Sequence, residues 1–323
     1  MTAVDTYKED FLAFLNTRIH IKEPRKLYEP IQYILQIGGK RLRPILTIMT
    51  CDIFNGNVKA SYDAALAVEV FHNFTLIHDD IMDSAPLRRG METVHQKWDI
   101  NTGILSGDAM LILAYQCFEN YPPEIFKKLM VLFSQTALEV CEGQQLDIDF
   151  ETRNNVSIEN YIQMITYKTS VLVGAAMKMG AIVANVCDNE AEKIYQFGLN
   201  LGIAFQLQDD LLDTFGNAET FGKKIGGDID ENKKTFLYLK ALEVCSENDK
   251  NELLNLYSSK SSDSSKIVAV TNIFSENKIE ELTKNEILYY TNKAFEILNS
   301  LSLSDEKKAI LENFGFNLMK RTV

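Results

Sequence analysis

The stretch DAALAVEVFHNFTLIHDDIMD, residues 63–83, sets the pattern that the rest of the chain follows. Its apolar residues recur every three or four positions, which predicts one long helix with a wide apolar face. Three acids, Asp79, Asp80 and Asp83, fall at the carboxyl end of that helix. A helix carboxyl end already bears partial negative charge, so acids there are destabilising on their own. The position calls for compensating cations.

A second stretch, KIYQFGLNLGIAFQLQDDLLDTFG at residues 193–216, repeats the arrangement. It also predicts a helix, and the acids at its end are Asp209, Asp210 and Asp213. In both copies the first and last aspartates are four residues apart, which places them about 40° apart around a helix axis. They therefore share one face, and the middle aspartate is set off to the side.

The repeated DDxxD spacing predicts magnesium ions bound around a polyphosphate. Magnesium usually binds through one or two carboxylates together with substrate phosphates. The alternative is a solvated acidic helix end, and two copies, each after an apolar helix, argue against it. The formal net charge of -12 argues against a nucleic-acid binder, which would normally carry a basic face. An acidic protein with a phosphorylated substrate needs metal ions to mediate.

The remaining pattern predicts an all-α fold in a single domain, residues 1–323. No proline follows Pro123, so residues 124–323 run without a helix breaker. No alternating strand pattern with hairpin turns is visible. The most membrane-like run, Val171 to Val186, is interrupted by Lys178 and is too short to span a bilayer comfortably. We expect it to be a buried core helix.

The cysteines and the first residues bear on the compartment. The five cysteines include no CxxC pair, so neither a zinc site nor a disulfide framework is indicated. They are interpreted as small buried apolar residues in a reducing environment. The start, MTAVDTYKEDFLAFL, mixes acids with apolar residues and lacks a signal-peptide pattern. We expect a cytoplasmic protein.

Basic residues stand beside both acidic motifs. Arg88 and Arg89 offer planar guanidinium groups that suit phosphate oxygens. Lys168 interrupts an apolar helix, where an unpaired charge is expensive. The other clusters are Lys40, Arg41 and Arg43 in GGKRLRP, and Lys223, Lys224, Lys233 and Lys234 after the second motif. Each alone can be a solvated surface charge, but their positions next to the aspartates favour a diphosphate site.

With these segments in view, the chain resembles the trans-prenyl diphosphate synthases, or polyprenyl synthetases. The matching segments, in the family's order, are GGKRLRP, HNFTLIHDDIMDSAPLRRG followed by TVH, GQQLD, YKTS, FQLQDDLLD and GKKIGGDIDENKKT. The resemblance implies an all-α isoprenoid synthase fold around a deep central cavity, usually a homodimer. It also implies condensation of isopentenyl diphosphate with an allylic diphosphate (dimethylallyl, geranyl or farnesyl), using about three magnesium ions.

By position, the resemblance gives each candidate residue a role. The expected magnesium ligands are Asp79, Asp83 and Asp209, supported by Asp80, Asp210 and Asp213. The expected contacts of the allylic diphosphate are Arg88, Lys168, Thr169, Gln206, Lys223 and Lys233. The expected contacts of isopentenyl diphosphate are Lys40, Arg43, His72 and Arg89. The family often has one residue fewer around the GK loop, so Lys224 stays an alternative to Lys223.

The resemblance also implies a reaction that agrees with these residue types. Metal ions and basic side chains neutralise the charge that develops on the leaving diphosphate as the allylic bond ionises. The resulting cation needs a dry apolar pocket, because water would quench it. The isopentenyl double bond then attacks, and loss of a proton completes the longer chain. The departing pyrophosphate is the expected base.

Product length is argued from the helix that leads into Asp79. The growing chain is expected to pass Thr75, Phe74 and Phe71, with Phe74 about 7.5 Å along the axis from Asp79. In the family, bulky residues four and five positions before the motif act as a floor, and filling only the second favours geranylgeranyl. Here only Phe74 is bulky, which predicts geranylgeranyl diphosphate, with farnesyl diphosphate next. The alternative is that Phe74 is core packing and the floor lies on another helix.

Two other functions share some of these features. A class I terpene cyclase also uses DDxxD and magnesium, but it normally replaces the second DDxxD by an Asn/Asp–Ser/Thr–Glu motif. A non-catalytic subunit of a heteromeric prenyl synthase usually lacks one of the aspartate motifs, and both are intact here. Dependence on isopentenyl diphosphate separates a synthase from a cyclase.

Overall fold

The structure is a computed structural model, and it describes residues 3–153, 155–217, 225–258 and 264–319. The chain divides into two compact units. Unit 1 comprises Met1–Ser134 and Ala175–Glu192, and unit 2 comprises Gln135–Gly174 and Lys193–Val323. The single-domain prediction stays a prediction, and each unit is described by itself below.

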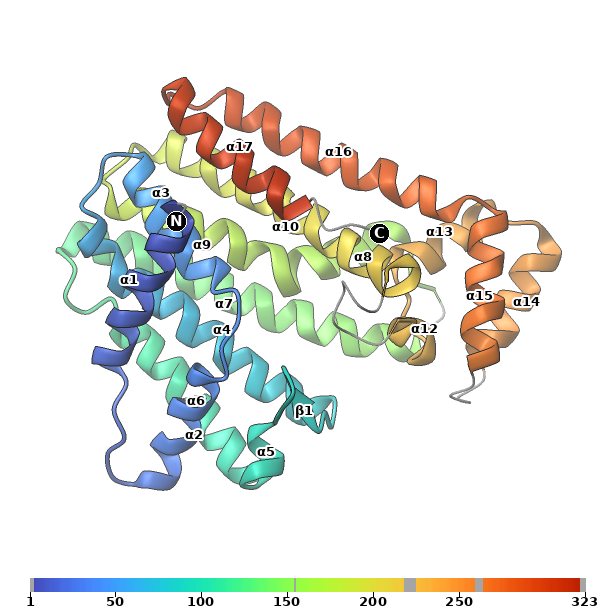
Figure 1. Cartoon of the computed structure of the whole chain (residues 1–323), viewed down its shortest axis with the longest axis horizontal. Helices are drawn as coiled ribbons and strands as arrows, with labels where there is room; N and C mark the ends of the chain where they lie inside the picture. Colours follow the sequence, from blue (N-terminus) through green and yellow to red (C-terminus); the bar gives the residue numbers. More distant parts are fainter. Residues whose placement is uncertain (1–2, 154, 218–224, 259–263, 320–323) are drawn as a thin grey trace. The chain divides into compact units, whose positions relative to one another are not determined.

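Unit 1 is formed almost entirely of helices (Figure 1). In chain order they are α1 (Ala3–Arg18), α2 (Arg25–Gln36), α3 (Leu42–Ile53), the 3-10 helix η1 (Val58–Ser61), α4 (Tyr62–Met82), α5 (Val94–Lys97) and α6 (Ile100–Gln116). Helix α4 packs against α1, α2, α3, α5 and α6, which makes it the centre of this unit. The helix predicted over residues 63–83 is therefore confirmed, with Asp83 as its C-cap residue.

A small β-hairpin follows α4, and the expectation that the chain has no strands or hairpin turns is wrong there. Strands β1 (Leu87–Arg88) and β2 (Met91–Glu92) pair antiparallel across a two-residue turn. Arg89 and Gly90 at the turn have φ of 53° and 77°, as a type I′ turn requires. Strands of two residues are too short to leave an alternating pattern in the sequence.

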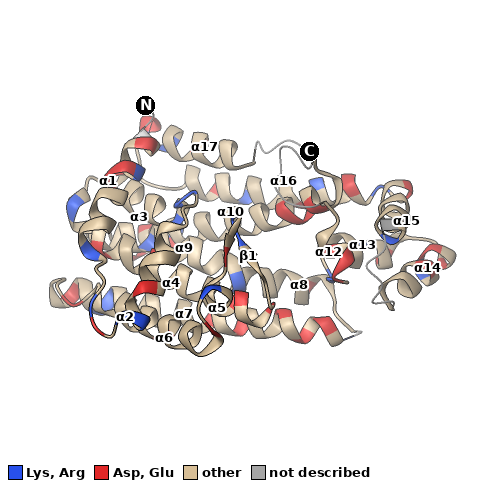
Figure 2. Cartoon of the chain, turned by 60° about the horizontal axis from the view of Figure 1, so that its bottom comes forward, with Lys and Arg blue, Asp and Glu red and all other residues tan. Residues whose placement is uncertain are grey.

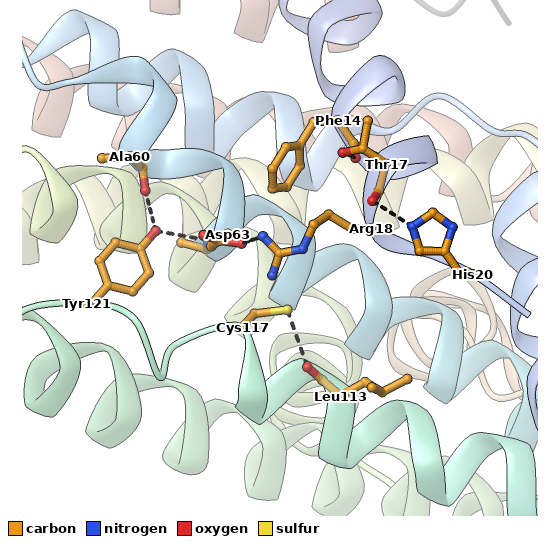
Figure 3. A network of polar contacts seen from close by, with 10 residues as sticks. Phe14, Thr17, Arg18, His20, Ala60, Asp63, Leu113, Cys117 and Tyr121 are labelled. Atoms are coloured by element: carbon orange, nitrogen blue, oxygen red, sulfur yellow. Dashed lines mark hydrogen bonds and ion pairs between the residues drawn. The ribbon is translucent and has the colours of Figure 1, made fainter. Parts of the chain in front are cut away.

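Polar contacts fix the start of α4 (Figure 3). Tyr121 donates a hydrogen bond from its hydroxyl to the carbonyl of Ala60 and accepts one from the amide of Ala64 at 3.1 Å. Arg18 of α1 pairs with Asp63 at 2.6 Å. That ion pair is partly exposed and contributes only about 0–1 kcal/mol, so the Tyr121 contacts do more to hold this end of the helix. They set where α4 begins and hence where its terminal aspartates fall.

Three helices contribute residues to both units: α7 (Pro123–Thr152), α9 (Val171–Val183) and α10 (Asp188–Phe215). The predicted helix over residues 193–216 forms the larger part of α10. The run from Val171 is largely buried, as expected for a core helix. Within the described residues, no helix is long and apolar enough to cross a membrane.

The remaining elements belong to unit 2. They are α8 (Ile158–Ile165), the π-helical turn η2 (Thr166–Ser170), α12 (Gly227–Asp230), α13 (Phe236–Val244), α14 (Glu247–Ser258), α15 (Ser264–Glu276), α16 (Ile279–Asn299) and α17 (Asp305–Met319). Helix α16 packs against α13, α15 and α17, and α16 and α17 lie side by side in Figure 1. Ser157 is the N-cap residue of α8, and Asn160 completes a capping box with it.

The all-α fold class is confirmed, and the charge distribution agrees with the composition. Figure 2 shows Lys and Arg scattered among Asp and Glu along the described helices. The cysteine prediction is right for Cys51, Cys117 and Cys245, which are buried. It is wrong for Cys141 and Cys187, which are exposed because each lies on the outer side of its segment.

Candidate active site

The first aspartate motif ends α4, and its three carboxylates differ in their surroundings. Asp80 is only 1% exposed and is held by Arg88, whose Nε lies 2.8 Å from both carboxylate oxygens. Burial raises the pKa of Asp80, and the Arg88 guanidinium opposes that rise. The carboxylate of Asp79 makes no hydrogen bond or ion pair with any described residue, whereas its backbone carbonyl accepts from the amide of Asp83 at 2.9 Å. Asp83 is exposed. Asp79 is thus available to an incoming cation, whereas Asp80 is committed to Arg88.

The hairpin after α4 aims the two arginines that the sequence singled out. Arg88 lies in β1 opposite Met91 and turns back to Asp80. Arg89 occupies the turn and donates from Nη1 to the carbonyl of Gly38. The two arginines therefore serve different neighbours: Arg88 joins the aspartate motif, and Arg89 joins the glycine loop between α2 and α3.

Glycine is required in that loop. Gly38 and Gly39 have φ of 93° and 128°, a region that side chains rarely adopt. A Cβ atom on Gly39 would lie 2.5 Å from Nη1 of Arg89, so any larger residue would displace the guanidinium. The GG pair lets the loop and the Arg89 side chain approach each other closely.

The basic cluster of this loop divides into structural and available groups. Arg41 is 6% exposed and donates to the Glu69 carboxylate and to the carbonyl of Leu35. A buried pair of this kind holds the loop on α4, because removing one partner would leave a buried charge unpaired. Lys40 is exposed and has no ion pair with any described residue. Of these two neighbours, only Lys40 is free to meet a ligand.

Arg43 and His72 form a partly buried polar pair next to this loop. The guanidinium Nη1 of Arg43 lies 3.2 Å from Nε2 of His72. Burial, followed by the charges of Arg43 and Arg89, holds the pKa of His72 well below its ordinary value, so the imidazole is neutral and accepts this hydrogen bond. Burial also lowers the pKa of Arg43, to about 10. Its buried Nε has no hydrogen-bond partner among the described residues, which suits an incoming anion.

The second aspartate motif faces a cavity of about 200 Å³ within unit 2. The predicted site residues that line it are Lys168, Thr169, Gln206, Asp209, Asp210, Asp213 and Lys233. They come from η2, from α10 and from the segment before α13. Lys223 and Lys224 lie outside the described residues. The cavity therefore brings together four of the residues expected to contact the allylic diphosphate: Lys168, Thr169, Gln206 and Lys233. Arg88, which was expected to contact the same diphosphate, lies in unit 1.

Lys168 and Thr169 lie on a π-helical turn, Thr166–Ser170, at the point where the sequence shows Lys168 within an apolar helix. The hydroxyl of Ser170 donates to the carbonyl of Ile165 at 3.2 Å, five residues back. Single π turns inside helices often mark functional sites, because they redirect a side chain without ending the helix. The turn lies against α7, where a Cβ on Gly143 would come within 2.2 Å of the Lys168 amide nitrogen.

Asp147 is a site residue that sequence reasoning missed. It lies one turn after Gly143 on α7, and its carboxylate accepts a 2.5 Å hydrogen bond from Nζ of Lys168. The pair is less than a third exposed, and it lines the same cavity. The signal was present in the segment GQQLD, which contributes both the close approach at Gly143 and the carboxylate.

The middle aspartate of the second motif is held by neutral donors. The hydroxyl of Tyr161 donates to Oδ2 of Asp210, and Nε2 of Gln206 donates to Oδ1 at 3.1 Å. The hydroxyl of Thr169 adds a further hydrogen bond to this network, because it donates to Oε1 of Gln206 at 3.4 Å. Burial, and then the nearby Asp228 carboxylate, raise the pKa of Asp210 well above its ordinary value. The role of Tyr161 at the site was also missed, because an aromatic residue on an apolar helix face is typical of a residue that packs in the core.

The third aspartate of this motif supports the segment that follows. Asp213 accepts a hydrogen bond from the amide of Asp228 at 2.9 Å, at the start of α12. Asp228 in turn lies 3.5 Å from Nζ of Lys233, and Glu231 lies 2.9 Å from the same nitrogen. Burial alone would lower the pKa of Lys233, but these two carboxylates outweigh it and raise the pKa. Asp228 was missed by sequence reasoning although it lies in GGDID.

Lys234 has a structural task rather than the phosphate contact considered for its cluster. Its ammonium group donates to the carbonyls of Phe150, at 2.7 Å, and Arg153. Those carbonyls belong to the carboxyl end of α7, where the helix leaves acceptors without partners and carries partial negative charge. Lys234 therefore caps α7 while it also borders the cavity, and Lys233 is the one of these two lysines whose ammonium group pairs with carboxylates, those of Asp228 and Glu231.

The residues present suit magnesium bound jointly with a phosphate. No group of three or more His, Cys, Asp or Glu in the described ranges is arranged to hold a metal ion alone. Magnesium keeps few protein ligands and completes its shell with water and substrate phosphates. Asp79 has both carboxylate oxygens available, and Asp209 lines the cavity. This pattern fits ions that bind together with a diphosphate.

The expected floor residues all lie in unit 1, on α4. Phe71 is fully buried, and its ring packs edge-on against Phe133 at 5.2 Å. Phe74 keeps 7% of its surface exposed. Thr75 turns its hydroxyl to the carbonyl of His72 at 2.8 Å and leaves little bulk at its position. Of the three, Phe71 is core, and Phe74 is the large side chain that is still in part accessible.

Comparison with known proteins identifies relatives across almost the whole chain. A family model described as polyprenyl synthetase matches residues 24–274. The geranylgeranyl diphosphate synthase of Methanosarcina mazei is 37% identical over 318 residues, covering 97% of this chain and 96% of the relative. That of Sulfolobus acidocaldarius is 37% identical over 281 residues, 86% and 85% of the two chains. A crystal structure of a geranylgeranyl pyrophosphate synthase superimposes with a TM-score of 0.96 at 50% identity, covering both chains fully.

Proposed function

The chain belongs to the polyprenyl synthetase family, and from that premise we propose that it condenses isopentenyl diphosphate with an allylic diphosphate to make geranylgeranyl diphosphate. Membership makes the protein a short-chain trans-prenyltransferase. The observation that carries the proposal is the cavity of unit 2, where the second aspartate motif meets Lys168, Gln206 and Lys233. This combination of acids and cations suits a diphosphate bound with metal ions.

We assign the metal to the outer aspartates of the motifs. In unit 1, Asp79 and Asp83 would hold magnesium. In unit 2, Asp209, with Asp213 in support, would hold magnesium together with the allylic diphosphate. Bound magnesium would supply positive charge at the leaving diphosphate, which favours ionisation of the allylic C–O bond. The inner aspartates, Asp80 and Asp210, position their neighbours, since their oxygens already accept hydrogen bonds from side chains.

The cations act on the leaving group. Lys168 lies on the π turn and is oriented by Asp147, so its ammonium group is held at the cavity before substrate arrives. A preorganised charge costs no reorganisation when negative charge develops on the diphosphate. Lys233, kept protonated by Asp228 and Glu231, adds a second fixed positive charge at the same cavity. Arg88 is anchored to Asp80 and adds a guanidinium beside the first motif.

We assign isopentenyl diphosphate to the glycine loop between α2 and α3 and the residues beside it in unit 1. Lys40 is exposed, Arg43 has a buried nitrogen without a partner among the described residues, and Arg89 borders the glycine loop. The neutral His72 fixes the Arg43 guanidinium and adds no charge of its own. Arg41 is excluded from this set, because Glu69 already holds it.

Geranylgeranyl diphosphate is proposed as the product because Phe74 is the one bulky residue at the two positions before the first motif. Thr75 leaves room for a chain longer than farnesyl, and Phe74 limits further growth. Phe74→Ala is expected to lengthen the products by at least one isoprene unit. The relatives that are named geranylgeranyl diphosphate synthases support this length.

One experiment tests both the reaction and the length. Purified protein is incubated with magnesium, isopentenyl diphosphate and each allylic primer in turn, and the dephosphorylated alcohols are sized by chromatography. Twenty-carbon products that require isopentenyl diphosphate are expected. Cyclised hydrocarbons formed from an allylic diphosphate alone would instead identify a terpene cyclase. A Phe74→Ala variant that is active but has an unchanged product distribution would move the floor to another helix.

We also propose a homodimer. Unit 1 exposes a row of large apolar side chains, with Leu105 and Ile112 of α6 about 60% exposed and Val131 of α7 65% exposed. Leu105 and Ile112 are seven residues apart and share one face of α6. Exposed apolar faces of this kind usually mark protein contacts. Sedimentation at micromolar concentration tests the proposal, and a monomer there would refute it.

A further inference from the structure

An aromatic row lies on one face of α4, directly before the first aspartate motif. Phe71, Phe74 and His78 occupy positions i, i+3 and i+7, which bring their side chains together on one helix face. The Phe74 ring lies 5.6 Å from the ring of Phe71 and 4.8 Å, edge-on, from that of His78. Phe74 is therefore covered on both flanks by rings, and 7% of its surface stays exposed.

Helix α6 fixes the far side of this row. The Nε2 of His78 donates to the carbonyl of Ile104 at 3.2 Å and lies 3.9 Å from the Asp108 carboxylate. The ring sits in a notch at Gly107, where a Cβ atom would come within 2.3 Å of Nε2. Because glycine leaves this space open, His78 can lie directly on α6 while it touches Phe74.

We propose that His78 and Gly107 determine product specificity by holding the Phe74 ring in one orientation. This inference rests on the proposed role of Phe74 as the floor. A helical phenylalanine has two accessible χ1 wells, and they place its ring over different parts of the helix surface. If the Phe74 side chain moved between these two χ1 wells, growth of the prenyl chain would stop at more than one length. The clamp between Phe71 and His78 selects one well, so His78 and Gly107 are positioning residues that need not touch the substrate.

The chain offers a matched control on α6. Gly103 lies four residues before Gly107 and also faces α4. A Cβ atom there would meet Cδ1 of Ile81 at 2.9 Å, the flexible end of an aliphatic side chain that moves aside easily. Gly103→Ala and Gly107→Ala thus add the same methyl group to the same helix face, but only the second displaces an aromatic ring.

The experiment measures product ratios at matched conversion for Gly107→Ala, His78→Ala and Gly103→Ala, with circular dichroism as the check on folding. Gly107→Ala and His78→Ala are expected to raise the share of the minor chain length by roughly two- to tenfold, the factor that corresponds to one aromatic pair. Gly103→Ala should keep the wild-type ratio. A loss of stability alone would lower turnover without altering this ratio.

Two double variants make the test specific. Adding Gly107→Ala or His78→Ala to Phe74→Ala should change nothing further, because no ring is left to hold. Wild-type ratios in an active His78→Ala variant, or a shift that persists in the Phe74→Ala background, would overturn the proposal. If Gly107→Ala fails to fold, His78→Ala decides, since it removes atoms instead of adding them. If Phe74→Ala itself leaves the products unchanged, the floor assignment has failed instead.

Discussion

The two aspartate motifs have the same spacing and opposite surroundings. In the first, Asp80 is neutralised by a cation, Arg88, which reaches it from a hairpin eight residues on. In the second, Asp210 is held by a phenol and an amide, and a further carboxylate, Asp228, helps to raise its pKa after burial. The third aspartates differ as well, because Asp83 is exposed and Asp213 accepts an amide hydrogen bond.

The difference teaches that DDxxD spacing defines positions but not roles. The first aspartate of each motif is half-buried and carries the expected metal contact, whereas the middle one is buried and belongs to the protein's own hydrogen-bond network. In unit 1 that network contains a full positive charge. In unit 2 the donors to Asp210 among the described residues are neutral, the Tyr161 hydroxyl and the Gln206 amide.

The largest expected effect is the loss of an outer aspartate. Asp79→Ala and Asp209→Ala should each lower turnover by at least about a hundred- to a thousandfold, because each removes charge stabilisation at the leaving group. Circular dichroism should show both variants folded. Asp108→Ala, on an exposed acid of α6, is the control. A near-normal rate for either variant at saturating magnesium would show that this aspartate is not a metal ligand and that the first aspartates of the two motifs have different roles.

Substitution of the basic residues in the two units should affect different substrates. Lys40→Ala, and likewise Arg43→Ala, should raise the KM for isopentenyl diphosphate, and Lys168→Ala should impair the allylic substrate, each by roughly ten- to a hundredfold for a charged hydrogen bond. Lys128→Ala removes an exposed ion pair with Asp188 and should change neither KM. Steady-state kinetics with each substrate varied in turn measures this. If each variant affected the KM of both substrates equally, the assignment of these cations to two separate diphosphate sites would be wrong.

Substitution of the two middle aspartates should lower the free energy of unfolding by different amounts. Asp80→Asn leaves Arg88 without its anion and should cost about 1–3 kcal/mol of unfolding free energy, since Arg88 is only partly exposed. Asp210→Asn exchanges a carboxylate whose pKa is raised for a neutral amide that still accepts from Gln206, and should cost about 1 kcal/mol or less. Urea unfolding of metal-free protein compares them. The reverse order would mean that Arg88 is not what holds Asp80.

The smallest effect concerns pH and the arginine-rich side of unit 1. Because the pKa of His72 is lowered by folding, the unfolded chain binds a proton that the folded chain does not as pH falls below about 6.5. Stability contributed by neutral His72 is full above that pH and declines below it, by up to about 1.4 kcal/mol per pH unit. His72→Gln should flatten the slope, and His20→Gln, on an exposed histidine, should not. An unchanged slope in His72→Gln would show that another group titrates.

Local information sufficed for much of the fold. The helix periodicity and the proline-free stretch predicted helices that the structure contains, because these signals act within one or two turns. The hairpin at Leu87–Glu92 was missed, since two-residue strands carry no period. The π turn at Thr166–Ser170 was missed because a single irregular turn inside a helix leaves the apolar periodicity on either side unchanged.

The candidate site divides in the same way. The sequence by itself determined which residues are acidic or basic, their spacing at two helix ends, and through these the family. Only the tertiary structure decided which of them are already engaged: Asp80 with Arg88, Arg41 with Glu69, Asp210 with Tyr161, and Lys234 with the end of α7. Three of these four pairs join residues 28 or more positions apart. The energy of a charge depends on its desolvation and on its partners, and both are set by segments that meet only when the chain folds.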